Sequence, residues 1–143
     1  MILLDTNVVS ELMRSAPEPA VLVWIDAIPS ATVFVSAITR AEIFYGIALV
    51  PEGRRRDRLE QAVHTAFETY FRGRVLPFDS EAADAFALLA AARRRAGRPI
   101  SQADAQIAAI ARSRGADLAT RNVPDFVGCG VEVINPWSSG GKS

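Results

Sequence analysis

The sequence repeats one local pattern, in which a short apolar or β-branched run ends at a polar residue that can begin a helix. Residues 2–4 are Ile-Leu-Leu and precede Asp5, and residues 32–35 are Thr-Val-Phe-Val and precede Ser36. Such runs are typical of buried parallel strands, and Asp and Ser are favoured helix N-caps. Because parallel strands need crossover connections, the pattern predicts an α/β fold with helices on both faces of a parallel sheet.

The same pattern divides the whole chain into alternating elements. We expect strands at residues 2–4, 32–35, 75–78, 118–120 and 131–134. We expect helices at residues 6–13, 18–28, 37–48, 54–71, 80–96 and 102–114. A chain of 143 residues suits one domain, expected over residues 1–137, and the Gly/Ser-rich residues 138–143 are expected to be a disordered tail.

Three residue types that often carry catalysis are almost absent. The chain has one His (His64), one Cys (Cys129) and one Lys (Lys142). This excludes an intrachain disulfide, a cysteine zinc cluster and a multi-histidine metal site. Triad chemistry survives only if His64 is the base. Asp, Glu and Arg remain plentiful, so an enzyme of this composition would use carboxylates with a hard cation such as Mg²⁺.

The sequence contains no segment typical of membrane insertion or secretion. No apolar run approaches the ~20 residues of a membrane span, and the N-terminus lacks a basic leader followed by an apolar stretch. We therefore expect a cytoplasmic protein.

Acidic residues recur where predicted strands pass into helices. Asp5 follows the first strand, Glu42 lies on the second turn of the helix after the second strand, and Asp104 lies three residues after Ser101. In open parallel sheets, ligands bind beyond the carboxyl ends of the strands. Clustered carboxylates repel one another, and a divalent cation is the usual remedy. The placement therefore predicts a site for Mg²⁺ or Mn²⁺.

Each of these residues also has a purely structural interpretation. Asp5 suits a cap of the first helix, Asp104 suits a capping box with Ser101, and Glu42 suits an exposed helix face. In the last third of the chain, Asp125 suits a turn with Pro124, and Asn122 suits a cap. A cap and a site role are compatible.

Four segments together resemble the PIN-domain ribonucleases. They are Met-Ile-Leu-Leu-Asp-Thr-Asn at residues 1–7, residues 36–42, Ala-Asp-Ala-Gln-Ile-Ala-Ala at residues 103–109, and Leu-Ala-Thr-Arg-Asn at residues 118–122. The resemblance is to the bacterial VapC toxin branch and above all to its FitB-like members, and it covers residues 1–137. It implies a PIN-like three-layer fold with a central five-stranded parallel sheet.

The resemblance also implies an activity and a site. The family members are metal-dependent endoribonucleases, toxins of toxin–antitoxin pairs, whose acidic residues hold Mg²⁺ or Mn²⁺. Asp5, Glu42 and Asp104 match those acids and would be both metal ligands and catalytic residues. The matching positions that would support the site are Thr6, Asn7, Ser36 and Thr120.

The fourth acidic position of the family departs from its pattern here. It is commonly Asp, whereas this chain has Asn122, with Asp125 three residues later. Either residue is a candidate fourth ligand, so occupancy by one or two metal ions is open. The resemblance implies hydrolysis that leaves a 5′-phosphate and a 3′-hydroxyl.

Arginines form two dense clusters within a chain of zero net charge. Candidate RNA contacts are Arg54 and Arg55 in the first cluster and Arg93 and Arg94 in the second, because arginine clusters bind phosphates. Solvated helix ends are the alternative interpretation.

Apolar residues are unusually frequent in the helices near residues 18–28 and 37–50, which indicates an exposed groove or a dimer face. The resemblance implies a homodimer and a VapB-like antitoxin whose C-terminal segment packs over the groove, often with an arginine near the acids. The competing hypothesis is a non-catalytic PIN-like module that binds RNA or protein.

Overall fold

The computed structural model describes residues 1–138. Over these residues the chain forms one five-stranded parallel sheet in the order β3-β2-β1-β4-β5. The strands are β1 (Ile2–Leu4), β2 (Val33–Ser36), β3 (Val75–Leu76), β4 (Asp117–Ala119) and β5 (Val133–Ile134). The α-helices are α1 (Thr6–Leu12), α2 (Pro19–Asp26), α3 (Ala37–Ala48), α4 (Arg54–Glu68), α5 (Ser80–Arg95) and α6 (Gln102–Arg114). Two 3₁₀ turns complete the chain, η1 (Ser30–Thr32) and η2 (Val123–Phe126).

This architecture confirms the predicted α/β class and the five-stranded parallel sheet. Two expected strands are shorter than predicted, at residues 75–78 and 131–134. Both lie at the edges of the sheet, where a strand pairs on one side only. Pro77 lacks the N–H that would extend β3. The expected tail residues 139–143 lie outside the described residues.

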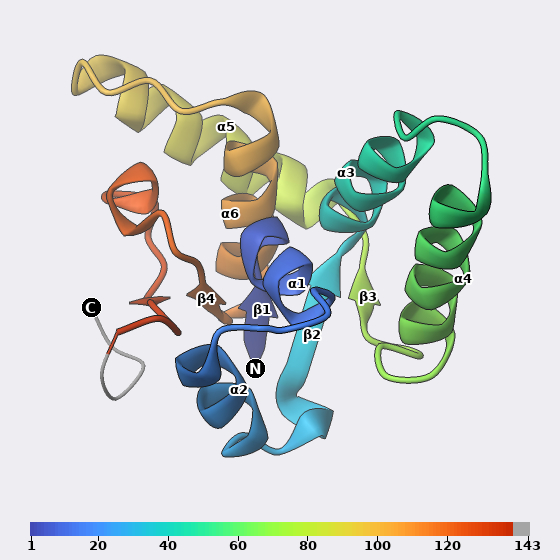
Figure 1. Cartoon of the computed structure of the whole chain (residues 1–143). Coiled ribbons are helices and arrows are strands. Elements are labelled where there is room, and N and C mark those ends of the chain that lie inside the picture. Colours follow the sequence, from blue (N-terminus) through green and yellow to red (C-terminus); the bar gives the residue numbers. More distant parts are fainter. Residues whose placement is uncertain (139–143) are drawn as a thin grey trace.

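Side chains alternate between the two faces of the sheet and form two cores. Leu3 and Leu118 pack with α5 and α6, whereas Leu4 and Ala119 pack with the side of α1 to α4. Figure 1 shows α5 and α6 (yellow to orange) together beside the sheet, with α1 and α2 (blue) on the other side. The result is a three-layer domain.

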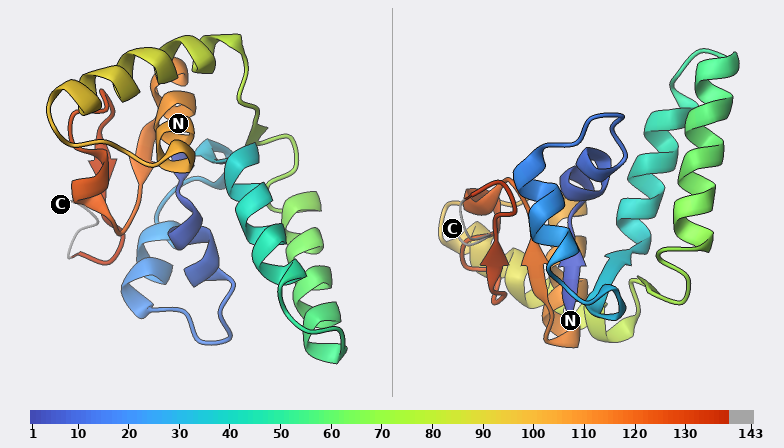
Figure 2. Two further views of the ribbon diagram at one scale, coloured as in Figure 1. Left: turned by 90° about the horizontal axis from the view of Figure 1, so that it is seen from above. Right: turned by 60° about the horizontal axis from the view of Figure 1, so that its bottom comes forward.

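The pair of helices α3 and α4 extends away from the sheet. α3 begins directly after β2, and α4 returns to the sheet from the far end of the pair, as Figure 2 shows. Tyr45 and Leu49 on α3 are 68% and 67% exposed. No helix within residues 1–138 is both long and apolar enough to span a membrane.

Candidate active site

The carboxyl ends of β1, β2 and β4 meet at one edge of the sheet, because these three strands are parallel neighbours. Asp5 follows β1, Ser36 ends β2 and Thr120 follows β4. Helix α6 begins at this edge and places Asp104 in its first turn. The edge therefore gathers the predicted site residues from four segments of the chain.

Asp5 is almost fully buried, at 4% exposure, and its carboxylate is held by three donors. Oδ1 accepts the backbone N–H of Thr6 at 2.8 Å, which confirms the helix-cap interpretation. Oδ2 accepts the hydroxyl of Thr120 at 2.8 Å and Nδ2 of Asn7 at 3.3 Å. Since a carboxylate oxygen offers about two lone pairs, Oδ1 keeps one for a further partner.

Burial raises the pKa of Asp5 to about 6, and repulsion from Asp104 and Glu42 adds to the rise. The hydrogen bonds from Thr120 and the Thr6 N–H act in the opposite direction. No ion pair involves Asp5 within residues 1–138. A buried carboxyl with this surrounding is a poor place for an uncompensated negative charge and a good place for a bound cation.

Glu42 is exposed and is held by a chain of hydroxyl groups. Thr6 Oγ1 donates to Glu42 Oε1 at 2.7 Å, and Thr39 Oγ1 lies 3.0 Å from Thr6 Oγ1. Ser36 Oγ donates to Thr39 Oγ1 at 3.3 Å. Each hydroxyl has a single proton, so the direction is set: Ser36 donates to Thr39, Thr39 to Thr6, and Thr6 to Glu42. This row of hydroxyl groups orients Oε1 of Glu42 and leaves Oε2 without a hydrogen bond from the described residues.

Asp104 is half-buried on α6, and Ser101 Oγ accepts its backbone N–H at 3.2 Å. Ser101 therefore caps α6 as the sequence predicts. Burial raises the pKa of Asp104, and the charges of Asp125 and Glu42 raise it further. Arg93 acts in the opposite direction.

The fourth position lies on the loop that follows β4. The backbone N–H of Asn122 donates to Thr120 Oγ1 at 3.1 Å, and its exposed side chain makes no hydrogen bond with the described residues. Asp125 lies in η2, where Pro124 begins the predicted turn, and its carboxylate is close enough to influence Asp104. The choice between Asn122 and Asp125 stays open.

The carboxylate oxygens are of the type that hard divalent cations prefer, but the carboxylates do not converge on one point. Within residues 1–138, no three Asp, Glu, His or Cys side chains converge closely enough to hold one ion together. Mg²⁺ commonly uses one or two carboxylates and keeps several waters, so the arrangement is compatible with an ion that reaches some carboxylates through water. Asp5 Oδ1, Glu42 Oε2 and the carboxylate of Asp104 are available to such an ion.

One predicted RNA contact is wrong. Arg93 is only 7% exposed, and its guanidinium lies inside the protein. Nε donates to the carbonyl of Arg98 at 2.7 Å, and Nη1 donates to the carbonyls of Asp125 and Val127 at 2.6 and 2.9 Å. These bonds use Nε and Nη1 in the interior, where Arg93 joins the segment before α6 to the loop after β4.

The other three arginines named from the sequence are exposed. Arg54 and Arg55 begin α4, at the end of the α3–α4 pair that is remote from the sheet (Figure 2). Arg94 lies in the last turn of α5. Their contact with RNA stays a prediction. His64 stacks against Phe44 with ring centroids 4.7 Å apart, which agrees with a packing role.

Two further residues were not identified from the sequence. Thr39 completes the hydroxyl chain, and its spacing of three residues from both Ser36 and Glu42 was the available signal. Glu11 is buried in α1, where Oε2 accepts the N–H of Glu18 at 2.9 Å and pairs with Arg14 at 3.1 Å. The bond from Glu18 lowers the pKa of Glu11, and the cluster fixes the turn between α1 and α2.

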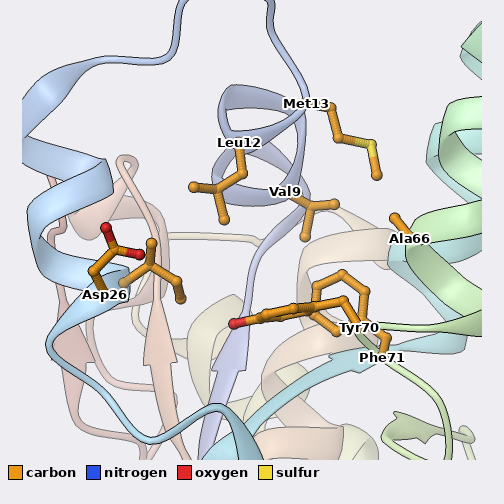
Figure 3. Close-up of a pocket in the computed structure, with 8 residues that line it drawn as sticks. Val9, Leu12, Met13, Asp26, Ala66, Tyr70 and Phe71 are labelled. Carbon is orange, nitrogen blue, oxygen red and sulfur yellow. The ribbon is translucent and has the colours of Figure 1, made fainter.

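Two hollows on the α1–α4 side of the sheet differ in chemistry. A groove of about 590 Å³ is lined by Thr6 and Glu42 together with apolar side chains that include Ile43, Ile47 and Val63. A smaller pocket of about 250 Å³ lies between α1, α2 and the end of α4. Figure 3 shows its side chains, which are mainly apolar, with Asp26 and Tyr70 as the polar exceptions. None of the candidate catalytic acids lines it, so the chemistry points to the groove.

Comparisons with known proteins agree with this geometry. The PIN domain family model matches residues 2–123. The chain is 44% identical to VapC ribonuclease Y4jK of Sinorhizobium fredii over 137 residues, which are 96% of this chain and 98% of that protein. It is 39% identical to toxin FitB of Neisseria gonorrhoeae, with 96% of this chain and 99% of that protein covered. The crystal structure of FitAcB from Neisseria gonorrhoeae superimposes with a TM-score of 0.91 at 38% identity, over 97% of this chain and 100% of that chain.

Proposed function

Because the chain belongs to the PIN-domain family, we propose that it is a divalent-metal-dependent endoribonuclease and the toxin of a toxin–antitoxin pair. The observation that carries this proposal is the state of Asp5. It is a buried carboxyl without an ion-pair partner within residues 1–138, with two further acids acting on it. The names of the relatives, a VapC ribonuclease and a toxin, support the same activity.

We propose that Asp5, Glu42 and Asp104 hold the metal, with Mg²⁺ or Mn²⁺ as the ion. Their oxygens match the preference of these ions. When bound, such an ion would neutralise the acidic edge, activate water and stabilise the developing charge on a phosphodiester. One ion is the minimal occupancy, because the fourth position carries a neutral amide in Asn122.

Neighbouring side chains orient the carboxylates of Asp5 and Glu42. Thr120 and Asn7 hold one orientation of the Asp5 carboxylate, and Thr6 holds that of Glu42. Orienting these two carboxylates does not require a histidine as proton donor or acceptor. This fits a hydrolysis in which water attacks phosphorus in line and the departing oxygen is the 3′-hydroxyl of the upstream nucleotide.

We propose that the groove of about 590 Å³ receives a segment of an antitoxin. Its lining combines apolar side chains with Glu42, so an extended or helical segment with apolar side chains and an arginine would fit. Such an arginine would compete with a cation for Glu42 and Asp5. A homodimer is the other proposed assembly, and exposed Tyr45 and Leu49 on α3 are the side chains that would contact a second copy.

The proposed activity is tested with purified protein and a labelled RNA. The wild type should cleave in Mg²⁺ or Mn²⁺ and stop in EDTA. Asp5→Asn, Glu42→Gln and Asp104→Asn should each lose at least 100-fold of the rate, since ligand and orienting groups contribute at this scale. Circular dichroism and thermal unfolding would check that each variant is folded. A non-catalytic RNA-binding module would bind RNA without metal-dependent cleavage.

A further inference from the structure

Arg121 lies beside the acidic edge but was not among the candidate RNA contacts. It follows Thr120 directly, and its backbone N–H donates to Asn7 Oδ1 at 3.2 Å. Asn7 in turn donates from Nδ2 to Asp5 Oδ2 at 3.3 Å. One side chain therefore ties the backbone of Arg121 to the carboxylate of Asp5.

The guanidinium of Arg121 is held by an aromatic ring. Its Cζ atom lies 5.1 Å from the centroid of the Trp137 ring. The Trp137 side chain is partly buried and packs against the core on the α1–α4 side, and the backbone N–H of Trp137 donates to Asn135 Oδ1 at 2.9 Å. The ring is thus a fixed support, and a flexible arginine placed on it loses less conformational freedom when it binds a ligand.

The hydrogen-bonding capacity of this guanidinium is unused. Arg121 is exposed, and within residues 1–138 its side chain forms no ion pair within 4.0 Å and no hydrogen bond. Its charge acts on Glu11 only at longer range. A cation–π contact engages the face of the guanidinium and leaves its N–H edges free, and those edges match two oxygens of a phosphate.

The surrounding charge explains why such a group is needed. Asp5, Glu42 and Asp104 make this edge acidic, so an approaching phosphodiester backbone is repelled next to the place where it must bind. We infer that Arg121, supported by Trp137, binds a backbone phosphate of the RNA adjacent to the one that is cleaved. This inference rests on the proposed function and adds a substrate contact to it.

Arg93 shows the contrast between the two kinds of arginine at this site. Its Nε and Nη1 donate to backbone carbonyls in the interior, so its role is structural. Arg121 is exposed and is held through its backbone N–H and the face of its guanidinium, and its side-chain donors have no hydrogen bond with residues 1–138. The difference identifies Arg121 as the ligand-binding one.

The test measures RNA binding in a variant that does not cleave. In the Asp5→Asn background, the affinity for a short fluorescein-labelled single-stranded RNA is measured by anisotropy over a series of salt concentrations. Arg121→Gln should weaken binding about tenfold and reduce the slope of log K against log salt by about 0.7, the value for one phosphate on a single strand.

The matched control is Arg72→Gln. Arg72 is also exposed, but it lies just before β3 and thus at the opposite edge of the sheet. It should leave the affinity and the salt slope unchanged. An equal loss of affinity in both variants would overturn the inference, because the effect would then be one of net charge alone. An unchanged salt slope in Arg121→Gln would also overturn it, because no phosphate contact would have been lost.

The ring gives an independent readout. Trp137→Phe keeps an aromatic face and should retain most of the affinity, whereas Trp137→Leu should reproduce the loss seen in Arg121→Gln. In the cleaving protein, Arg121→Gln should raise KM and leave kcat unchanged, as expected for a group away from the reacting atoms. Loss of kcat alone contradicts the inference but not the nuclease activity. If the wild type neither binds nor cleaves RNA, both the inference about Arg121 and the proposed nuclease function are wrong.

Discussion

The hydroxyl of Thr120 donates to Oδ2 of Asp5 at 2.8 Å and joins two residues that are 115 positions apart in the chain. Thr120 Oγ1 in turn accepts hydrogen bonds from the backbone N–H of Asn122 at 3.1 Å and from Nδ2 of Asn7 at 3.2 Å. Thr120 therefore connects the buried acid to the loop that carries the fourth position, and its hydroxyl is fully enclosed.

Replacing Thr120 with Val should weaken metal binding, because Val keeps the shape of Thr but donates no hydrogen bond to Asp5. Loss of a bond that orients a ligand commonly costs about 10- to 100-fold in metal affinity. Titration calorimetry with Mn²⁺ would measure it. Thr120→Ser retains the hydroxyl and should remain close to the wild type; equal affinity in Thr120→Val and Thr120→Ser would show that the bond has no role in metal binding.

The raised pKa of Asp5 predicts how stability depends on pH in the metal-free protein. The folded-state pKa is about 6 and the reference value is 3.8, so between these values the folded protein binds more protons than the unfolded chain. Its stability should therefore fall as the pH rises through this window, by about 3 kcal/mol at most. Urea unfolding in EDTA across pH 4 to 7 would measure the change.

Asp5→Asn is the control for this pH dependence. The variant has no carboxyl to titrate, so its free energy of unfolding should lack that decline. Adding Mg²⁺ at pH 7 should restore stability to the wild type and not to the variant, because a ligand that binds only the folded state stabilises it. Parallel pH curves for the two metal-free proteins would contradict the raised pKa.

Restoring an acid at the fourth position should change metal binding. Asn122 has an exposed side chain without a hydrogen bond to the described residues, so Asn122→Asp adds a negative charge without breaking a contact. We expect Mn²⁺ affinity or stoichiometry to increase in calorimetry. Asp125→Asn tests the neighbouring carboxylate; if Asp125 compensates for Asn122, this change should weaken binding and Asn122→Asp should reverse the loss.

Arg93 should prove important for stability. Arg93→Met keeps the apolar stem but leaves three backbone carbonyls without their donor, which should cost about 2–4 kcal/mol in the free energy of unfolding. Arg94→Met, at the next and exposed position, should cost less than about 0.5 kcal/mol. Similar urea midpoints for the two variants would show that Arg93 does not hold the loop.

The order of the elements was predictable because short, mostly apolar runs mark the strands and capping residues mark the starts of several helices. Asp5, Ser36 and Ser101 cap α1, α3 and α6, as their positions in the sequence indicate. The limits of β3 and β5 were not predictable, because edge strands depend on neighbours that the local sequence does not reveal.

The candidate acids were predictable from the sequence, but the side chains that contact or surround them were less so. Asp5 directly follows β1 and Glu42 lies on the helix after β2, so their placement after strands was enough to bring them to one edge. Asp104 lies on α6, which follows α5, and reaches this edge only through the tertiary fold. The roles of Arg93 and Arg121 depend on what their guanidinium groups contact. Apart from the bond between Arg93 and Arg98, these contacts are distant in the sequence, at Trp137 for Arg121 and at Asp125 and Val127 for Arg93. The sequence alone does not distinguish a buried arginine that bonds to backbone carbonyls from an exposed arginine that can bind a phosphate.

The most direct test of the account is to map the RNA ends produced by this protein in cells, with the Asp5→Asn variant as the control. Expression of the wild type should generate new ends that carry a 5′-phosphate and a 3′-hydroxyl, and Asp5→Asn should generate none at equal protein level. Ends with a 2′,3′-cyclic phosphate, or the same cleavage by Asp5→Asn, would contradict a hydrolysis that depends on the acidic edge.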